Sequence, residues 1–291
     1  MHAQFDLLMP TAFDEALDVL AEDGECMPLA GGTNVLVDLR ARAIAPKTLM
    51  SLGKLADLRR IEATDAQVIL GGGSTVSDIL RHPDMGRFGA SLSAAADVFA
   101  GQMVRNTATV AGNICCGSPA ADLVPPLLVL DAQVTLHSTR GTREVPLAEF
   151  FIDYKQNVRA PDELLTRVVW PKPPSNSADL FHKLARRKGD AVTVVGIAVA
   201  LTLDGDKCRR ARIALGAVAP TVKRATRAES MLEGETLTPA LIEAAARQAA
   251  DAGSPIDDVR ATGEYRRHGV HVLTRRLLTQ AWEKLSRGTR P

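Results

Sequence analysis

The sequence lacks the nucleotide-binding motifs and the charge bias that would assign many proteins of this size to a class. Its 291 residues contain neither G-x-G-x-x-G nor G-x-x-x-x-G-K-[ST], which argues against the commonest dinucleotide and nucleoside triphosphate folds. The 35 basic residues nearly balance the 34 acidic ones and leave a net charge of +1. Because such a chain has no electrostatic footprint for nucleic acid or an anionic membrane, we expect a small-molecule or protein ligand and no nucleic acid.

Cysteine is scarce and shows no ligand spacing. Cys26, Cys115, Cys116 and Cys208 form no C-x-x-C, and the adjacent pair could bridge only with strain. The six histidines include no H-E-x-x-H and no His/Cys cluster with zinc spacing. We therefore interpret the cysteines as buried free thiols and expect the chain to hold no metal of its own.

Long hydrophobic runs are also missing. The longest, AVTVVGIAVALTL at residues 191–203, is shorter than the roughly 20 residues of a spanning helix and is rich in β-branched residues, so it predicts a buried strand. The N-terminus carries Asp6, Asp14 and Glu15 without a basic lead into an apolar core, so no export signal is recognised. We expect a cytoplasmic protein without an integral membrane segment.

The first 174 residues predict a domain with two subdomains, about 1–54 and 55–174. In the first, Thr11 and Asp14 suggest a capping box for a helix that begins at Phe13, and strands at 26–30 and 48–52 flank a helix at 35–43 in a βαβ-like unit. The second predicts an α+β unit, with strands at 67–72, 133–138 and 163–170 and helices at 74–80 and 89–102.

A break at PKPPSNSAD, residues 171–179, predicts the domain boundary, because proline removes backbone donors and serine solvates a loop. Beyond it, residues 175–291 predict strands at 180–187, 191–203 and 208–219, followed by helices at 238–253 and 262–282. Strands followed by helices favour a second α+β domain.

Two glycine-bearing stretches carry the chemistry: LAGGTNVL at residues 29–36 and TVAGNICCGSPAAD at 109–122. Glycine permits positive φ and close approach to the backbone, and successive N–H groups in such a turn form an anion site that suits a pyrophosphate. A third stretch, LGGGSTVSDIL at 70–80, lacks the lysine of a phosphate loop. We interpret it as a strand-to-helix turn.

Read with FAGQMVRNTATVAGNICCGSPAADLVPPLLVLDAQV at residues 99–134, the sequence resembles the FAD-binding medium subunit of the molybdenum hydroxylase family, which includes xanthine and carbon monoxide dehydrogenases. The resemblance continues through residues 162–171, 181–201 and 264–278. It implies an α+β fold, with a two-subdomain FAD-binding domain of the PCMH type and a C-terminal α+β domain of the carbon monoxide dehydrogenase flavoprotein type.

The resemblance also implies the residues that bind the cofactor. In the family, two glycine stretches wrap the FAD pyrophosphate, which here implies Leu29, Ala30, Gly31, Gly32, Thr33 and Asn34 together with Ala108, Thr109, Val110, Ala111, Gly112 and Asn113. Ala111 replaces the first glycine of the family's second pair, and a methyl is tolerated there if φ is negative. Phe99 matches an aromatic on the adenine, Asp122 an acid near the flavin ring, Leu165 an isoalloxazine contact and Lys183 a base that lines the flavin pocket.

The function implied is that of an FAD subunit that passes electrons from a small [2Fe–2S] subunit to an external acceptor. A large molybdopterin subunit would oxidise the substrate, and the complex would form a dimer of heterotrimers. One alternative is a self-sufficient FAD-dependent reductase similar to enolpyruvyl-UDP-glucosamine reductase, whose family shares a turn like AGGTN. Another is an assembly scaffold with a decayed flavin site, which only Ala111 supports.

Overall fold

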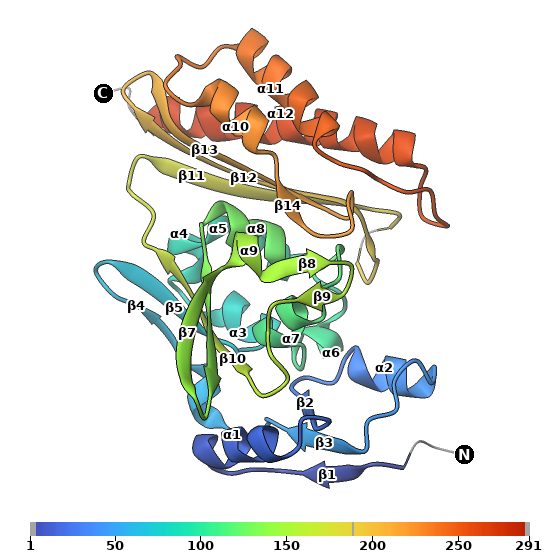
Figure 1. The fold of residues 1–291 in the computed structure, drawn as a ribbon. Coiled ribbons are helices and arrows are strands. Elements are labelled where there is room, and N and C mark those ends of the chain that lie inside the picture. The colour runs from blue at the N-terminus through green and yellow to red at the C-terminus, as the bar shows by residue number, and fades with distance from the viewer. Residues whose placement is uncertain (1–3, 188, 289–291) are drawn as a thin grey trace.

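The computed structural model describes residues 4–187 and 189–288, which form three packed bodies in chain order (Figure 1). The first body contains β1 (Asp6–Leu8), α1 (Phe13–Glu22), β2 (Met27–Leu29), α2 (Val35–Arg40) and β3 (Thr48–Ser51). Both β1 and β2 pair parallel with β3, which confirms the βαβ-like unit. Strand β1 was not predicted, because all three of its residues are exposed and show no alternation of apolar and polar side chains.

Helix α1 begins where the sequence predicts but is capped differently. It buries Ala16, Leu17 and Leu20 on one face, as the helical spacing requires. The Glu15 carboxylate accepts from the backbone N–H groups of Thr11 at 2.9 Å and Ala12 at 3.4 Å. The capping pair expected from Thr11 and Asp14 is therefore wrong, and Glu15 caps the helix alone.

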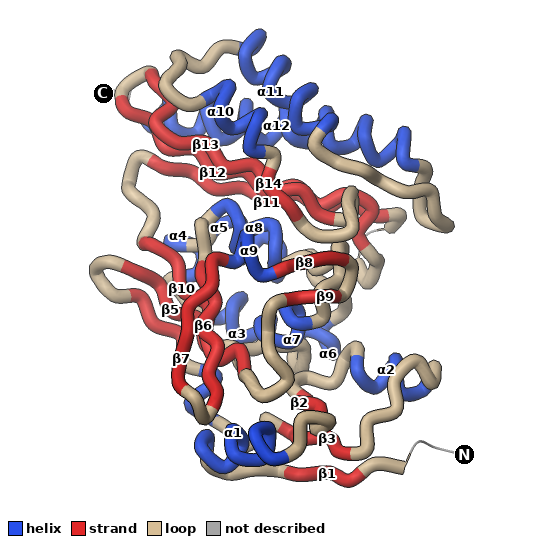
Figure 2. The backbone as a smooth tube through the Cα atoms, in the orientation of Figure 1, coloured by secondary structure: helices blue, strands red, loops and turns tan. Residues whose placement is uncertain are grey.

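The second body is built on an antiparallel sheet with the spatial order β4 (Ile61–Ala63), β5 (Gln67–Gly71), β10 (Leu164–Pro171), β6 (Gln133–Ser138) and β7 (Gly141–Pro146). Its other elements are η1 (Ala56–Arg59), α3 (Val76–Arg81), α4 (Met85–Phe88), α5 (Ala90–Asp97), α6 (Gln102–Arg105), α7 (Val110–Cys115), α8 (Val124–Val129), α9 (Leu147–Phe150), β8 (Phe151–Asp153) and β9 (Gln156–Asn157). Figure 2 shows these short helices and loops beside the sheet. The α+β prediction is confirmed, although most of the short helices were missed.

The helix predicted over residues 89–102 is wrong as a single element. It stops at Asp97, and α6 starts only at Gln102. Ala100 between them has φ +36°, which no α-helix contains. The alanine-rich pattern fits a helix, but tertiary contacts turn the backbone there.

The third body is an antiparallel sheet of β11 (Ser177–Ala185), β12 (Thr193–Asp204), β13 (Lys207–Gly216) and β14 (Lys223–Arg224), with α10 (Thr226–Leu232), α11 (Pro239–Asp251) and α12 (Gly263–Gly288). Figure 1 shows α11 and α12 on one face of this sheet and α5 and α8 beneath the other. The predicted strands and helices are confirmed. The break at 171–179 is shorter than expected, since β10 runs to Pro171 and β11 begins at Ser177, and the division at residue 174 stays a prediction.

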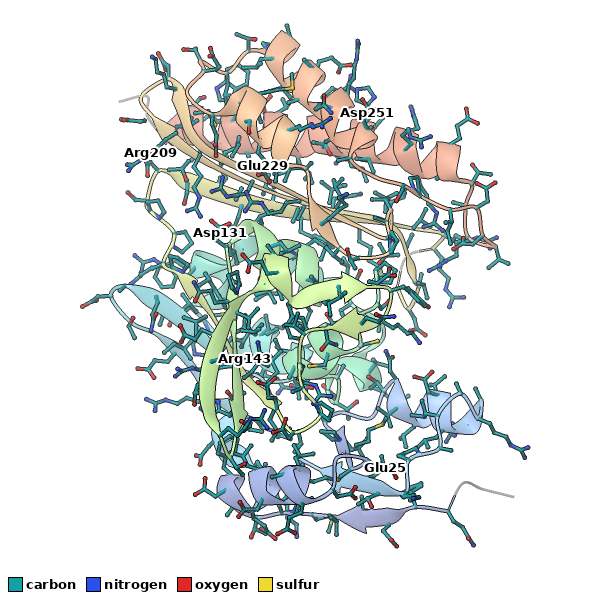
Figure 3. All side chains as sticks on the ribbon, viewed as in Figure 1. Glu25, Asp131, Arg143, Arg209, Glu229 and Asp251 are labelled. Carbon is teal, nitrogen blue, oxygen red and sulfur yellow. The ribbon has the colours of Figure 1, made fainter. Side chains whose placement is uncertain are left out.

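A network of charges joins the second and third bodies. Asp131, which follows α8, accepts from Arg212 Nε at 3.2 Å and Arg224 at 3.1 Å, and it also pairs with Arg210. Arg224 in turn pairs with Glu229 of α10. Figure 3 labels Asp131 and Glu229 on the two sides of this junction. In the described part of the chain, no helix is both long and apolar enough to cross a membrane.

Candidate functional site

A cleft lies between the first and second bodies, and parts of all three glycine stretches line it. Its walls come from Ala30, Gly31, Leu52, Gly53, Leu55, Leu58, Arg59, Gly72, Gly73, Thr75, Asn106, Thr107, Thr109, Ala111 and Leu165. The space measures about 640 Å³, including the part open to solvent.

The first glycine stretch forms the turn between β2 and α2. A Cβ on Gly31 would lie 1.9 Å from the carbonyl oxygen of Thr107, so only glycine lets this turn approach the second stretch. Gly32 has room for a Cβ but adopts φ +70°, which disfavours other residues. The N–H groups of Gly31, Gly32, Thr33 and Asn34 donate to no acceptor among the described residues. These four amides are therefore available to an anion.

The second and third stretches pair backbone to backbone. Val110 N–H donates to Ser74 at 3.0 Å, and Val76 N–H donates to the carbonyl of Ala108 at 3.0 Å. The hydroxyl of Thr109 accepts from Gly112 N–H at 3.1 Å and so caps α7. Because these amides are already used inside the protein, the second stretch forms a wall of the cleft rather than a row of free donors.

Ala111 fits at the position where the resemblance noted in the sequence implies glycine. It lies in the first turn of α7 with an ordinary negative φ, and its N–H donates to the carbonyl of Gly72 at 2.9 Å. A Cβ on Gly72 would lie 2.5 Å from the carbonyl of Leu165 and 3.0 Å from the Ala111 methyl. The absence of a side chain at Gly72 therefore makes room for Ala111.

Side chains link the first stretch to the end of α7. Asn34 Nδ2 donates to Cys116 Sγ at 2.8 Å, although 82 residues separate them. The Oδ1 atom of Asn113 is buried and finds no donor among the described residues.

The cysteines are all free, but only two of them are buried. The expectation of buried thiols is right for Cys26 and Cys208 and wrong for Cys115 and Cys116, which are partly exposed at the end of α7. Even so, desolvation raises the pKa of the Cys115 thiol to about 11. That thiol is a poor nucleophile at neutral pH.

Asp122 and Lys183 contact each other outside the cleft. Lys183 Nζ lies 2.7 Å from Asp122 Oδ2 and donates to the carbonyl of Val98 at 3.3 Å, and Thr193 donates to the other Asp122 oxygen. Both charged side chains are less than a tenth exposed. Burial raises the pKa of Asp122, while Lys183 and the Thr193 hydroxyl oppose that rise.

The structure thus divides the predicted site residues into groups. Ala30, Gly31, Thr109, Ala111 and Leu165 line the cleft. Leu29, Gly32, Thr33, Asn34, Gly112 and Asn113 flank these residues in the chain, and the side chains of Ala108 and Val110 are in the hydrophobic core. Phe99, Asp122 and Lys183 do not line the cleft. Their contacts with FAD stay predictions.

The third glycine stretch is the part that the sequence prediction underrated. It is the expected strand-to-helix turn, from β5 to α3, yet Gly72, Gly73 and Thr75 also line the cleft. Thr75 accepts from Asp78 N–H at 3.1 Å and its own N–H donates to Asp78 at 2.9 Å, a complete capping box. The sequence signal that could have indicated this part of the cleft was the run of three consecutive glycines before a capping box.

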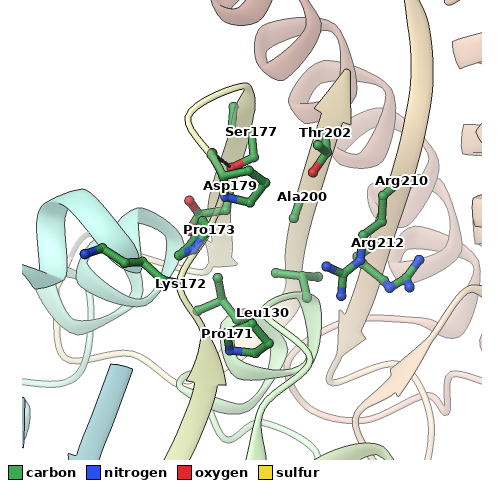
Figure 4. A pocket seen from close by; sticks show the side chains of 13 residues that line it. Leu130, Pro171, Lys172, Pro173, Ser177, Asp179, Ala200, Thr202, Arg210 and Arg212 are labelled. Atoms are coloured by element: carbon green, nitrogen blue, oxygen red, sulfur yellow. Dashed lines mark hydrogen bonds between the residues drawn. The ribbon is translucent and has the colours of Figure 1, made fainter. Parts of the chain in front are cut away.

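A second cavity lies at the junction of the second and third bodies (Figure 4). Leu130, Pro171, Ala200 and Thr202 are among its walls, with Arg210 and Arg212 on one side. Both arginines pair with Asp131, and Lys172 is engaged with Thr64 and the Phe88 ring. Its charges are thus used in packing, and the cleft with the free amides is the better candidate site.

Comparisons with known proteins identify the family of the chain. Residues 3–173 match the family model described as the FAD binding domain in molybdopterin dehydrogenase, and residues 180–281 match the CO dehydrogenase flavoprotein C-terminal domain. The chain belongs to the FAD-binding subunits of the molybdenum hydroxylase family. It is therefore the flavoprotein subunit of an oxidoreductase, and its cofactor is FAD.

Individual relatives span nearly the whole flavoprotein. The putative xanthine dehydrogenase FAD-binding subunit of Escherichia coli is 32% identical over 92% of both chains. The nicotinate dehydrogenase FAD-subunit of Eubacterium barkeri is 29% identical over 98% of both. A carbon monoxide dehydrogenase structure from Hydrogenophaga pseudoflava superposes with TM-score 0.94 at 28% identity and covers 97% of this chain and 99% of that chain. These matches favour the subunit over the self-sufficient reductase and confirm the α+β fold class.

Proposed function

We propose that this flavoprotein passes electrons from a [2Fe–2S] partner subunit to an external acceptor, with FAD seated along the cleft. The observation that carries the proposal is the set of four unpaired amides in the first glycine stretch, beside a cleft enclosed by the other two. Successive free N–H groups in such a turn bind anions, and the FAD pyrophosphate is one. FAD, when bound, supplies exchange between one-electron donors and a two-electron acceptor.

The remaining residues fit the same ligand. Arg59 is the charged residue among those that line the cleft, and its guanidinium pairs with no described carboxylate. It is placed to offset the charge of a pyrophosphate. The unpaired Oδ1 of Asn113 suits a hydroxyl donor of the cofactor. We assign Leu29 to Asn34 and Ala108 to Asn113 to the cofactor, and we keep Phe99, Asp122, Leu165 and Lys183 as proposed contacts of its ring systems.

The positions of the four cysteines support a separate iron–sulfur subunit. Cys26 lies in the core of the first body, Cys208 lies in that of the third, and Cys115 and Cys116 lie at the end of α7, so the four cannot meet as ligands of one cluster. We propose that a small [2Fe–2S] subunit and a large molybdopterin subunit supply those centres, in a dimer of heterotrimers. A cytoplasmic location is also proposed, on the sequence expectation alone.

The test is to express this chain alone, measure its FAD content, and assay candidate substrates before and after adding the partner subunits. We expect a yellow protein with one noncovalent FAD per chain and substrate-dependent turnover only with both partners. Robust turnover by the isolated chain, free of molybdenum and iron, would refute the subunit hypothesis. A colourless chain that does not take up added FAD would instead support the scaffold alternative.

A further inference from the structure

The turn between α5 and α6 directs four successive carbonyl groups at two cations. Arg105 Nη1 donates to the carbonyls of Phe99 and Ala100, each at 2.9 Å, and lies 3.4 Å from that of Asp97. Lys183 Nζ donates to the remaining carbonyl, that of Val98, at 3.3 Å. The conformation of the turn around Phe99 is therefore set by side chains that follow it in the sequence.

The turn needs this support because it is strained. Ala100 adopts φ +36°, a region that non-glycine residues rarely occupy. Such a backbone persists only when its surroundings over-determine it. Arg105 supplies most of that constraint, since one guanidinium group reaches three of the four carbonyls.

The same side chain connects the turn to the cleft wall. Arg105 Nη2 donates to Gln102 Oε1 at 3.2 Å, and Gln102 Nε2 donates to Asn106 Oδ1 at 2.9 Å. The Ser77 hydroxyl of α3 donates to the same Asn106 oxygen at 2.7 Å. Asn106 lines the cleft. One chain of hydrogen bonds therefore runs from the turn that carries Phe99 to the cleft.

We propose that Arg105 is a positioning residue for the cofactor. Arg105 holds Phe99 in the conformation that contacts FAD, and it fixes the position of Phe99 relative to the cleft wall. The proposal rests on the proposed function, which places Phe99 against the adenine. Arginine suits the role better than lysine, because its planar fork of donors can reach several carbonyls at once. A lysine at this position would keep the positive charge but would lack the planar set of donors.

The experiment compares Arg105→Gln and Arg105→Lys with the wild-type full chain and with Arg87→Gln, an exposed control that stacks on Phe88. Three quantities are measured: hydrogen exchange of the 97–101 amides without FAD, the FAD dissociation constant, and the visible circular dichroism of bound flavin. For Arg105→Gln we expect faster exchange, an FAD dissociation constant raised about tenfold and an altered flavin spectrum, since bonds to a charged group are lost. Arg105→Lys should change all three less, and Arg87→Gln should change none.

Adding Ala100→Gly to Arg105→Gln should restore much of the affinity, because glycine adopts the turn without strain. Faster exchange with unchanged affinity and spectrum in Arg105→Gln would overturn the proposal, and so would unchanged exchange. If Arg105→Gln does not fold, Arg105→Lys decides by the same readouts. A wild-type chain whose bound FAD protects neither residues 29–34 nor 106–113 from exchange would show instead that the site assignment has failed.

Discussion

Ala111 and Gly72 fit together as a pair: the N–H of Ala111 donates to the carbonyl of Gly72 at 2.9 Å, and the missing side chain at Gly72 leaves room for the Ala111 methyl. The departure of Ala111 from the family pattern is thus accommodated by a glycine in a different stretch. The only sequence feature that favoured a decayed flavin site loses its steric basis.

This pair gives a first prediction. Ala111→Gly should leave the FAD dissociation constant within about twofold and cost about 0.5–1 kcal/mol of stability, the usual penalty of glycine in a helix. Gly72→Ala should weaken FAD binding and destabilise the fold by about 1–3 kcal/mol, because its Cβ meets the Leu165 carbonyl. Urea unfolding and flavin fluorescence titration measure both effects. Stronger damage from Ala111→Gly than from Gly72→Ala would contradict this account.

The two glycines of the first stretch should respond differently to substitution. Gly31→Ala should release FAD, since its Cβ would overlap the Thr107 carbonyl. Gly32→Val should also release it, because valine rarely adopts φ +70°. Gly32→Asn should retain more FAD, because asparagine tolerates that backbone. The flavin-to-protein ratio after gel filtration ranks the variants by the FAD they keep. Full retention of FAD by Gly31→Ala or Gly32→Val would contradict the assignment of the pyrophosphate to this turn.

Arg59 should contribute electrostatically to FAD affinity. Arg59→Gln is expected to raise the FAD dissociation constant about 1.4- to fivefold, because exposed charge pairs contribute about 0.2–1 kcal/mol. The effect should shrink at high salt, which screens exposed charges. Arg60→Gln is the matched control, since Arg60 pairs with Glu62 at 2.7 Å. Titrations at low and high salt test the prediction, and equal effects of the two variants would place Arg59 outside the site.

Lys183→Met should affect both stability and flavin potential. It leaves Asp122 buried without its cation, a loss that typically costs about 3–5 kcal/mol. Since burial already raises the pKa of Asp122, the variant should lose further stability as pH rises above the ordinary aspartate range. The midpoint potential should fall if Lys183 lies near the ring. Adding Asp122→Asn should recover stability, and unfolding curves with spectroelectrochemistry compare the three proteins. No recovery would mean that the unpaired Asp122 carboxylate is not what destabilises Lys183→Met.

Low pH should weaken the contact between the first and second bodies through His137. Its ring packs on Phe13 and its Nδ1 lies 2.8 Å from the Thr166 hydroxyl. Burial and the Arg167 charge lower its pKa below the usual 6.5, so the unfolded chain takes up the proton first and stability falls as pH drops through that value. His137→Gln should show a smaller fall between pH 7.5 and about pH 5.5. Burial, and then the charge of Arg276, also lower the pKa of His182. Part of the pH dependence of stability should therefore remain in both the wild type and His137→Gln. Identical pH profiles would exclude a role for His137.

Some features were beyond sequence reasoning because they depend on partners far along the chain. The turn that follows the break at Asp97 in the predicted 89–102 helix is held in part by Lys183, which is 85 positions from Val98. The pairing of Asp122 with Lys183 joins residues that are 61 positions apart. Likewise, Gly72 shows no special requirement until Leu165 and Ala111 pack against it.

The sequence by itself determined most of the longer elements and the α+β class, because glycine stretches, apolar periodicity and proline breaks act through local backbone geometry. The family and its FAD cofactor were reached by resemblance to known sequences. Only the tertiary structure decided which amides are free, how Ala111 is accommodated, and that Asp122 and Lys183 pair away from the cleft. Those properties depend on what approaches each group in space. The identity of a residue does not show whether its backbone N–H is hydrogen-bonded, because that depends on which acceptors the fold brings near it.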